Sequence, residues 1–159
     1  MQPEEDRMVF NMKISTKGIY AIEAMTDLAI FSKNGVESIK NIASRRQLSE
    51  KYLEQIMAGL KKSKLIISTR GAGGGYKLAK SPESITVYEI LKAVESNMIF
   101  LECLEGKVDC GMDCERCKTR PIWKTMWEKI LTVFEGVTLA DIVQKSEEIQ
   151  KKRAEEYYI

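Results

Sequence analysis

The sequence contains no histidine and no long run of apolar residues. Any metal site must therefore use ligands other than imidazole. A membrane span needs roughly 18 to 20 apolar residues in a row, and no segment reaches that length, so we expect no membrane partner. Residues 1–11 are polar and acidic, unlike a secretion signal. We expect a flexible extension at 1–11 and a cytoplasmic protein.

Charge is distributed unevenly along the 159 residues. Residues 12–80 carry 13 basic and 5 acidic side chains, whereas residues 81–159 have a net charge of −4. Lysine and arginine displace the counterions condensed on phosphates, so the basic half favours a nucleic-acid partner. A solvated basic face without a ligand is the alternative. The length and the 44% hydrophobic content suit one domain, or one domain with an appended dimerisation arm.

The spacing of apolar residues predicts three helices in the basic half. The first is a buried helix over 16–31, and the second is short and spans 39–46. A tight turn at 47–48 leads to Ser49, which caps a third helix that ends near Ser63. Two short helices joined in this way are typical of a helix-turn-helix. The residues expected to point outward from the third helix are Glu50, Lys51, Tyr52, Glu54, Gln55 and Lys61.

A β-hairpin is predicted after the third helix. Residues 65–69 are rich in β-branched side chains, residues 70–75 contain four glycines, and residues 76–79 form the second strand. Glycines allow the hairpin tip to approach a phosphate or a groove wall closely. A nucleotide-binding P-loop is excluded, because the Gly-Lys-Ser/Thr ending is missing and no helix follows. The predicted DNA contacts of this wing are Arg70, Gly73 and Gly74.

A fourth helix is expected to start at Thr86, where Glu89 completes a capping box, and to pack on the first helix. Residues 12–97 are thus predicted to form a winged helix-turn-helix, mainly α with a small β-hairpin wing. Residues 98–120 lack periodicity and are expected to form a loop.

A long apolar helix is predicted from Pro121. Its stripe is too hydrophobic for a lone surface helix, so we expect it to pair with the same helix of a second subunit; covering the N-terminal domain is the alternative. Thr138 should cap a short last helix that ends near Gln144, followed by a charged tail of frayed helix or disorder at 145–159. The dimerisation segment is therefore 121–144. The side chains expected in the dimer interface are Trp123, Trp127, Ile130 and Phe134.

All four cysteines lie in the predicted loop, with the spacing C-x6-C-x3-C-x2-C. They are Cys103, Cys110, Cys114 and Cys117. Disulfides are disfavoured in a reducing cytosol, and incidental buried thiols would be spread through the core, so the cluster favours metal binding or redox sensing. Four thiolates suit a structural zinc site. A thiol switch is another alternative, because basic neighbours lower thiol pKa values; these neighbours are Lys107, Arg116, Lys118 and Arg120.

Four segments give the sequence a family resemblance. They are Lys13 to Ala21 (KISTKGIYA), Ser49 to Ile56 (SEKYLEQI), Arg70 to Tyr76 (RGAGGGY) and Thr138 to Ile142 (TLADI). In this order the segments resemble the Rrf2 family of bacterial winged-helix transcription regulators, with its IscR, NsrR and CymR types. The resemblance extends from about residue 12 to residue 143.

The resemblance implies a homodimer that binds a palindromic operator in double-stranded DNA. The third helix would enter the major groove and the wing the minor groove. The positions that match the family's DNA contacts are Lys51, Tyr52, Glu54, Gln55 and Arg70.

The resemblance also implies an iron-sulfur cluster, because Cys103, Cys110 and Cys117 match the three cysteines of cluster-binding members. Cys114 is additional. Arg120 occupies the position of the histidine ligand of IscR-like members, and Tyr20 that of the aspartate ligand of NsrR-like members. We therefore expect Cys114 to complete a four-thiolate site for a [2Fe-2S] or [4Fe-4S] cluster.

The sequence thus predicts a non-enzymatic, sequence-specific transcription regulator, most simply a repressor, whose DNA affinity is controlled by a cluster or by the redox state of the cysteine loop. Three alternatives remain. The first is a regulator with zinc or a thiol switch, and the second is one without metal that responds to a partner enzyme. The third is an iron-sulfur redox module whose basic half binds a protein.

Overall fold

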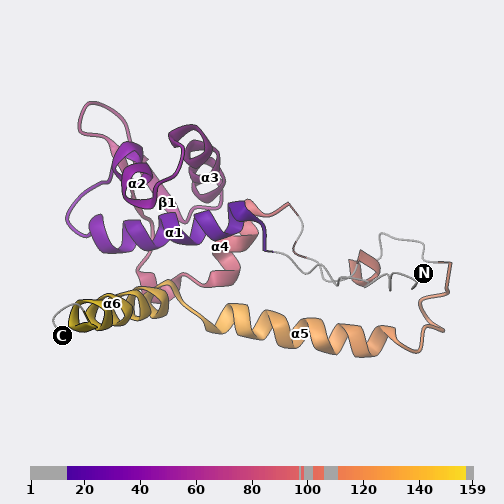
Figure 1. The fold of residues 1–159 in the computed structure, drawn as a ribbon. Helices are drawn as coiled ribbons and strands as arrows, with labels where there is room; N and C mark the ends of the chain where they lie inside the picture. Colours follow the sequence, from indigo (N-terminus) through magenta and orange to yellow (C-terminus); the bar gives the residue numbers. More distant parts are fainter. Residues whose placement is uncertain (1–13, 97, 99–101, 106–110, 157–159) are drawn as a thin grey trace, which may run out of the picture.

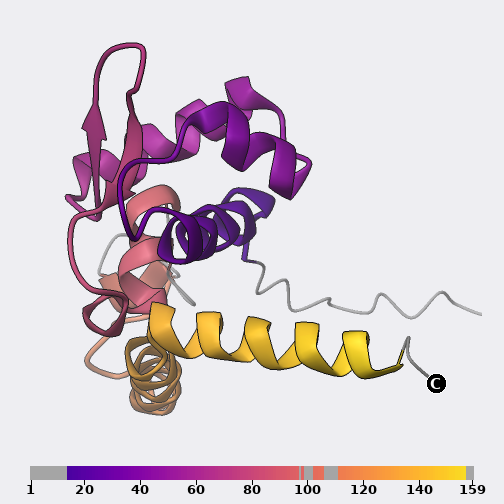
Figure 2. The ribbon, with the colours of Figure 1, turned by 90° about the vertical axis from the view of Figure 1, so that its left-hand side faces the viewer.

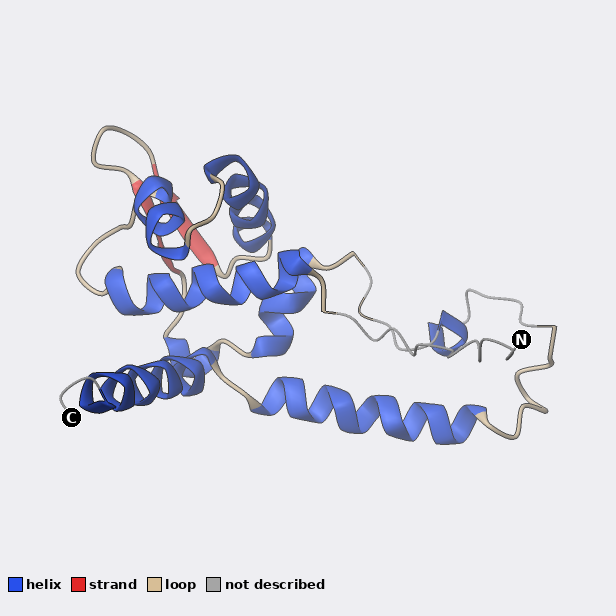
Figure 3. Cartoon of the chain, viewed as in Figure 1, coloured by secondary structure: helices blue, strands red, loops and turns tan. Residues whose placement is uncertain are grey.

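The computed structural model describes residues 14–96, 98, 102–105 and 111–156. Its elements, in chain order, are α1 (Thr16–Phe31), α2 (Ile39–Arg46), α3 (Glu50–Lys62), β1 (Ile66–Thr69), β2 (Gly75–Leu78), η1 (Pro82–Ser84), α4 (Val87–Val94), η2 (Glu102–Glu105), α5 (Arg120–Gly136) and α6 (Leu139–Glu156). Helices α1 to α4 and the hairpin form one body, and α5 lies beside it as a separate rod (Figure 1). The predicted fold class, mainly α with a β-hairpin wing, is confirmed (Figure 3).

Side-chain caps fix where the helices begin. The Ser38 hydroxyl accepts a hydrogen bond from Asn41 N at 3.1 Å, and the Ser49 hydroxyl accepts one from Tyr52 N at 3.3 Å. The predicted capping box is present, since Glu89 N donates to Thr86 Oγ1 and Thr86 N donates to Glu89 Oε2. Such caps satisfy backbone N–H groups that have no partner within the helix. The predicted starts of α2, α3 and α4 are therefore confirmed.

Helix α1 lies at the centre of the hydrophobic core. Met25 and Leu28 are fully buried, and α1 packs against α3 and α4. The predicted packing of the fourth helix on the first is thus confirmed. Helices α3 and α4 also approach closely at Gly59, which has no Cβ. A Cβ there would lie 2.8 Å from the Ala93 carbonyl oxygen. The largest fully buried side chains of α3 and α4 are Leu53, Ile56, Met57, Leu60, Ile90 and Leu91.

The wing is a two-stranded antiparallel sheet, and one residue from before α2, Glu37, pairs with the outer edge of β2. The pairing runs from Ile66 opposite Leu78 to Thr69 opposite Gly75. The backbone of Glu37, just before α2, exchanges two hydrogen bonds of 2.8 Å with Tyr76. A Cβ at Gly75 would collide with the Glu37 carbonyl, so glycine is required there. The contact ties the part of β2 nearest the wing tip to the segment before α2.

A buried carboxylate on α1 fixes the position of α2. Asp27 is fully buried and accepts two hydrogen bonds from Arg45, at 2.9 and 2.7 Å. The other α2 arginine, Arg46, lies 3.3 Å from Asp27 and 2.9 Å from Glu23. Arg45 also donates to Glu37 at 2.7 Å. Asp27 and Glu37 hold the pKa of the Arg45 guanidinium above its ordinary value, mainly through the Asp27 hydrogen bond.

The C-terminal helices are attached to the body where α5 ends and α6 begins. Val87 N donates to the Val137 carbonyl at 2.9 Å, Leu139 N donates to the Ile85 carbonyl at 2.8 Å, and the Leu139 side chain is fully buried. Thr138 caps α6 as predicted, because its hydroxyl accepts from Asp141 N. Figure 2 shows α6 continuing past the body as a straight rod.

The predicted end of the last helix, near Gln144, is wrong because α6 continues to Glu156. The segment contains no glycine or proline, and Lys145 pairs with Glu148 at 3.0 Å. Charged side chains of this kind propagate a helix well.

The predicted loop at 98–120 includes one turn of helix, η2, which the sequence did not indicate. The extension predicted at 1–11 lies outside the described residues. Among the helices of the described ranges, none combines the length and apolar character required to cross a membrane.

Candidate DNA interface and cysteine loop

The third helix of the body, α3, presents a polar outer face. Lys51, Glu54 and Gln55 are exposed, as expected. Tyr52 only partly follows the expectation, because it is half-buried and its ring packs edge-to-face on Tyr20, with centroids 5.8 Å apart. Three of the predicted contacts are thus accessible along α3, while Tyr52 also anchors α3 to α1.

The turn between α2 and α3 sets the angle of the outer helix. Gln47 adopts a left-handed conformation with φ of 55°, and Leu48 N donates to the Ala43 carbonyl at 2.9 Å. The half-buried Leu48 packs against the core. The predicted tight turn at 47–48 is therefore confirmed, and it presents α3 at the surface as a helix-turn-helix requires.

The tip of the wing depends on two of its glycines. Gly71 has a φ of +110°, and Gly74 N donates to the Gly71 carbonyl at 3.0 Å. A Cβ at Gly74 would collide with the Thr69 carbonyl, whereas nothing lies within 4 Å of a Cβ at Gly73. Arg70 is exposed beside them. The fold requires Gly74, but no contact within the chain accounts for Gly73.

Replacing Gly74 by alanine should lower the free energy of unfolding by about 1 to 3 kcal/mol, because the added Cβ would overlap the Thr69 carbonyl and force the tip to shift. The matched Gly73→Ala variant should change it by less than about 0.5 kcal/mol, because its Cβ enters open space. Chemical denaturation of both variants measures the difference. Equal stability of the two variants would contradict the assigned geometry of the tip.

The arginines of α2 neutralise much of the acidic charge of the basic half. Arg45 and Arg46 pair with Glu23, Asp27 and Glu37, which are three of the five acidic residues between 12 and 80. The other two, Glu50 and Glu54, both lie on α3. Among the other basic side chains of this half, Lys80 pairs with Glu89 at 3.0 Å, whereas Lys51 on α3 and Arg70 on the wing are exposed and available for phosphates.

The described cysteines lie on three separate parts of the loop. Cys103 is in η2, Cys114 is in a turn after Asp113, and Cys117 precedes α5; each is half-buried and reduced. Cys110 lies outside the described residues. Within the described part of the chain, no three or more cysteine or carboxylate side chains are grouped closely enough to hold a metal ion. Because Cys110 lies outside the described residues, the four-thiolate site stays a prediction.

The Cys117 thiol is placed to ionise. Its Sγ lies 3.5 Å from the Thr119 hydroxyl. That hydroxyl, and then the backbone N–H groups of Thr119 and Arg120 at the start of α5, lower the pKa of Cys117 below its ordinary value. Thiolates are the form that binds metals and reacts with oxidants.

Helix α5 exposes an apolar face along its whole length. None of its residues is buried, and the side chains of Ile122 and Val133 are 59% and 63% exposed. The predicted interface residues are all half-buried; they are Trp123, Trp127, Ile130 and Phe134.

Residues 14–145 match the family model Rrf2, described as an iron-dependent transcriptional regulator. The chain belongs to the Rrf2 family. It is 37% identical to the transcriptional regulator IscR of Erwinia tasmaniensis over 136 residues, which cover 86% of this chain and 81% of that protein.

Solved structures of Rrf2-family proteins have the same fold. The T. potens IscR structure superposes with a TM-score of 0.70 at 38% identity and covers 87% of this chain and 90% of that one. CymR, the global cysteine regulator of B. subtilis, gives a TM-score of 0.69 at 34% identity, with 84% and 97% covered. The predicted family is thus confirmed, and with it a non-enzymatic role in transcription regulation.

Proposed function

We propose that this Rrf2-family regulator is a homodimeric, sequence-specific repressor whose affinity for a palindromic operator is set by an iron-sulfur cluster. The ligands would be Cys103, Cys110, Cys114 and Cys117. The observation that carries the proposal is the position of the cysteine loop. It joins the winged helix-turn-helix to α5, and Cys117 lies just before the start of that helix.

DNA recognition is assigned to the exposed side chains of α3 and to the wing. The Glu54 carboxylate can accept a hydrogen bond from cytosine N4, and the Gln55 amide can form two with adenine in the major groove. Lys51 and Arg70 supply positive charge for phosphates. Gly73 lets the wing backbone approach the minor groove, which gives a reason for a glycine that the fold does not require. Tyr52 would contact DNA through the part of its side chain that is exposed.

The donor chemistry of the loop fits a cluster. Thiolates hold both [2Fe-2S] and [4Fe-4S] clusters, and the lowered pKa of Cys117 favours that form. The chain has no histidine, and Arg120, which follows Cys117 by three residues, cannot act as a ligand at neutral pH because its guanidinium stays protonated. A bound cluster would supply a link between the four thiolates that is sensitive to oxygen and redox state.

The chain itself connects the loop to the DNA-binding surface. Helix α5 begins at Arg120 and ends at Gly136, next to the hydrogen bond that Val87 N donates to the Val137 carbonyl. If the apolar faces of two α5 helices pair, the direction of each α5 sets the separation of the two α3 helices. The residues before Arg120 therefore control operator fit by fixing the start of α5.

The test is the visible absorption spectrum, with iron and sulfide assays, of protein purified without oxygen. Brown protein containing iron and sulfide is expected. Cys103→Ser and Cys117→Ser should remove the colour, and Cys114→Ser should do so if this extra cysteine is the fourth ligand. Met112→Ser, at a 61% exposed position in the same loop, is the control that keeps the colour. Colourless protein with bound zinc, or with no metal and a reversible disulfide, would replace the cluster by one of the alternatives.

A further inference from the structure

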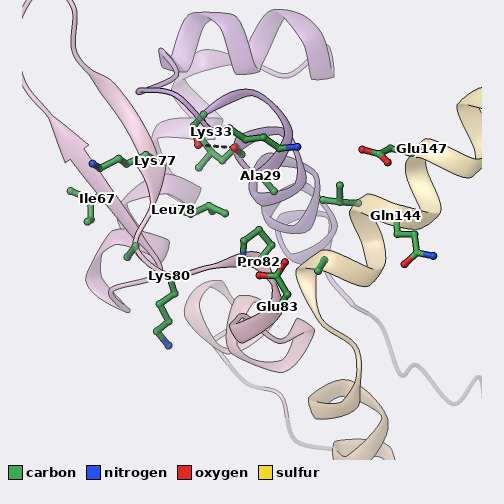
Figure 4. Close-up of a pocket in the computed structure, with 15 residues that line it drawn as sticks. Ala29, Lys33, Ile67, Lys77, Leu78, Lys80, Pro82, Glu83, Gln144 and Glu147 are labelled. Atoms are coloured by element: carbon green, nitrogen blue, oxygen red, sulfur yellow. Dashed lines mark hydrogen bonds between the residues drawn. The ribbon is translucent and has the colours of Figure 1, made fainter.

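A cavity lies beside the contact of α6 with α1 and η1. It has a volume of about 650 Å³ and lies between the last turn of α1, the base of the wing, η1 and the first turns of α6 (Figure 4). Leu78, Pro82 and Val143 give it partly apolar walls. Pockets of roughly 300 to 1,000 Å³ are typical of small-molecule sites.

The lining of the cavity includes charged residues, namely Lys33, Lys77, Lys80, Glu83 and Glu147. In Figure 4 the ammonium groups of Lys77 and Lys80 point away from the cavity. Lys80 is paired with Glu89 at 3.0 Å, but no carboxylate in the described ranges forms an ion pair with Lys33 or Lys77. In Figure 4 the Lys33 side chain extends from α1 toward the side on which α6 carries Glu147. A partly apolar cavity with the unpaired ammonium group of Lys33 at its edge can accept an anion with an apolar body.

The position of the cavity gives a ligand influence over α6. This helix is held to the body at its start, through the buried Leu139 and the bonds between residues 85–87 and 137–139. Beyond Val143, Gln144 and Glu147, which line the cavity, α6 projects away from the body (Figure 2). A molecule wedged between α1 and α6 would therefore alter the angle of α6 and of the adjoining end of α5.

We propose that this cavity is an effector site for a small organic acid, one carboxylate on an apolar body, and that its occupancy changes DNA affinity. The apolar part would contact Leu78, Pro82 and Val143, and the carboxylate would pair with Lys33. The binding step does not depend on a cluster. The regulatory step rests on the DNA-binding role of the proposed function.

Binding is tested with full-length protein and the fluorescent anion 8-anilinonaphthalene-1-sulfonate as the probe. Octanoate should displace the probe, and octylammonium, with the same chain length and opposite charge, should not. Lys33→Glu should weaken displacement by octanoate about tenfold, as expected when an attractive surface charge becomes repulsive. Gln144→Trp should abolish it by filling the cavity from an exposed position. Lys129→Glu makes the same charge change on α5 and is the control.

Displacement by both octyl compounds, or equal displacement from the wild type and Gln144→Trp, would overturn the binding site. DNA affinity measured with and without saturating octanoate tests the regulatory step. A change of about fivefold or more is expected in the wild type and none in Gln144→Trp, and unchanged wild-type affinity would overturn the effector role. If no DNA binds under any condition while the displacement pattern holds, the proposed function fails and the binding site stands.

Discussion

Replacement of Asp27 by alanine is expected to lower the free energy of unfolding by about 3 kcal/mol. The carboxylate is fully buried and is the common partner of Arg45 and Arg46. Removing one member of a buried ion pair costs about 3 to 5 kcal/mol because the other charge loses its partner. The lower end applies here, since the arginine side chains are 31% and 23% exposed and keep some contact with water. Denaturant titration of the folded protein measures the loss.

Glu23→Ala is the matched control for Asp27→Ala. Glu23 also pairs with Arg46, at 2.9 Å, but its side chain is 48% exposed. Exposed pairs contribute no more than about 1 kcal/mol, so this variant should remain close to the wild type. If Asp27→Ala proved as stable as Glu23→Ala, Asp27 would not be the residue that fixes α2 on α1.

Replacement of Trp127 by glutamate is expected to convert a dimer into a monomer. Trp127 lies on the apolar face of α5, where no residue is buried within one chain. Loss of a central aromatic residue costs on the order of 2 kcal/mol or more per copy. A symmetric interface contains two copies, so dimerisation should weaken by about 1000-fold. Sedimentation equilibrium at micromolar concentration measures the mass directly.

Lys129→Glu separates the effect of the apolar face from that of added charge. Lys129 is exposed and lies two residues after Trp127 in α5. At 100° per residue, its side chain points about 200° around the helix from that of Trp127. This variant should retain the dimer. A wild-type protein that is monomeric at these concentrations, or a Trp127→Glu variant of dimer mass, would remove α5 from the interface.

The sequence predicted the DNA-binding body well because two independent signals coincide there. At α2, α3 and α4 a capping side chain stands directly before an apolar period, so both the start and the buried face are defined. In the wing, β-branched residues flank a glycine-rich tip. Each of these signals is local, and the structure confirms the elements that they predict.

The interactions missed from the sequence join residues that are distant in the chain. The pairing of Glu37 with Tyr76 involves a single residue on one side and has no periodic pattern. The sequence does contain one indication of the Asp27 contacts. A carboxylate within the apolar stripe of α1 needs a cationic partner. Helix α6 is longer than predicted. The low hydrophobicity of residues 145–156 indicates a frayed tail, but the charged side chains of this segment favour helix.

The cysteine loop shows the limit of spacing as evidence. Four cysteines within 15 residues predict a shared site, but proximity in sequence does not determine where the side chains meet. Residues 111–119 adopt turns, and these are local structures that do not by themselves bring Cys103 to Cys117. The ligand set therefore stays a prediction until metal content is measured.

Control of operator binding by the cysteine loop is tested by comparing the DNA affinity of cluster-loaded and metal-free protein. A DNA fragment selected by the protein from random sequence is titrated with cluster-loaded and metal-free protein at one fixed salt concentration. Allosteric coupling typically changes affinity by about 5- to 150-fold, and we expect the two forms to differ within that range. Equal affinity of the loaded and metal-free forms would show that the cysteine loop does not control operator binding.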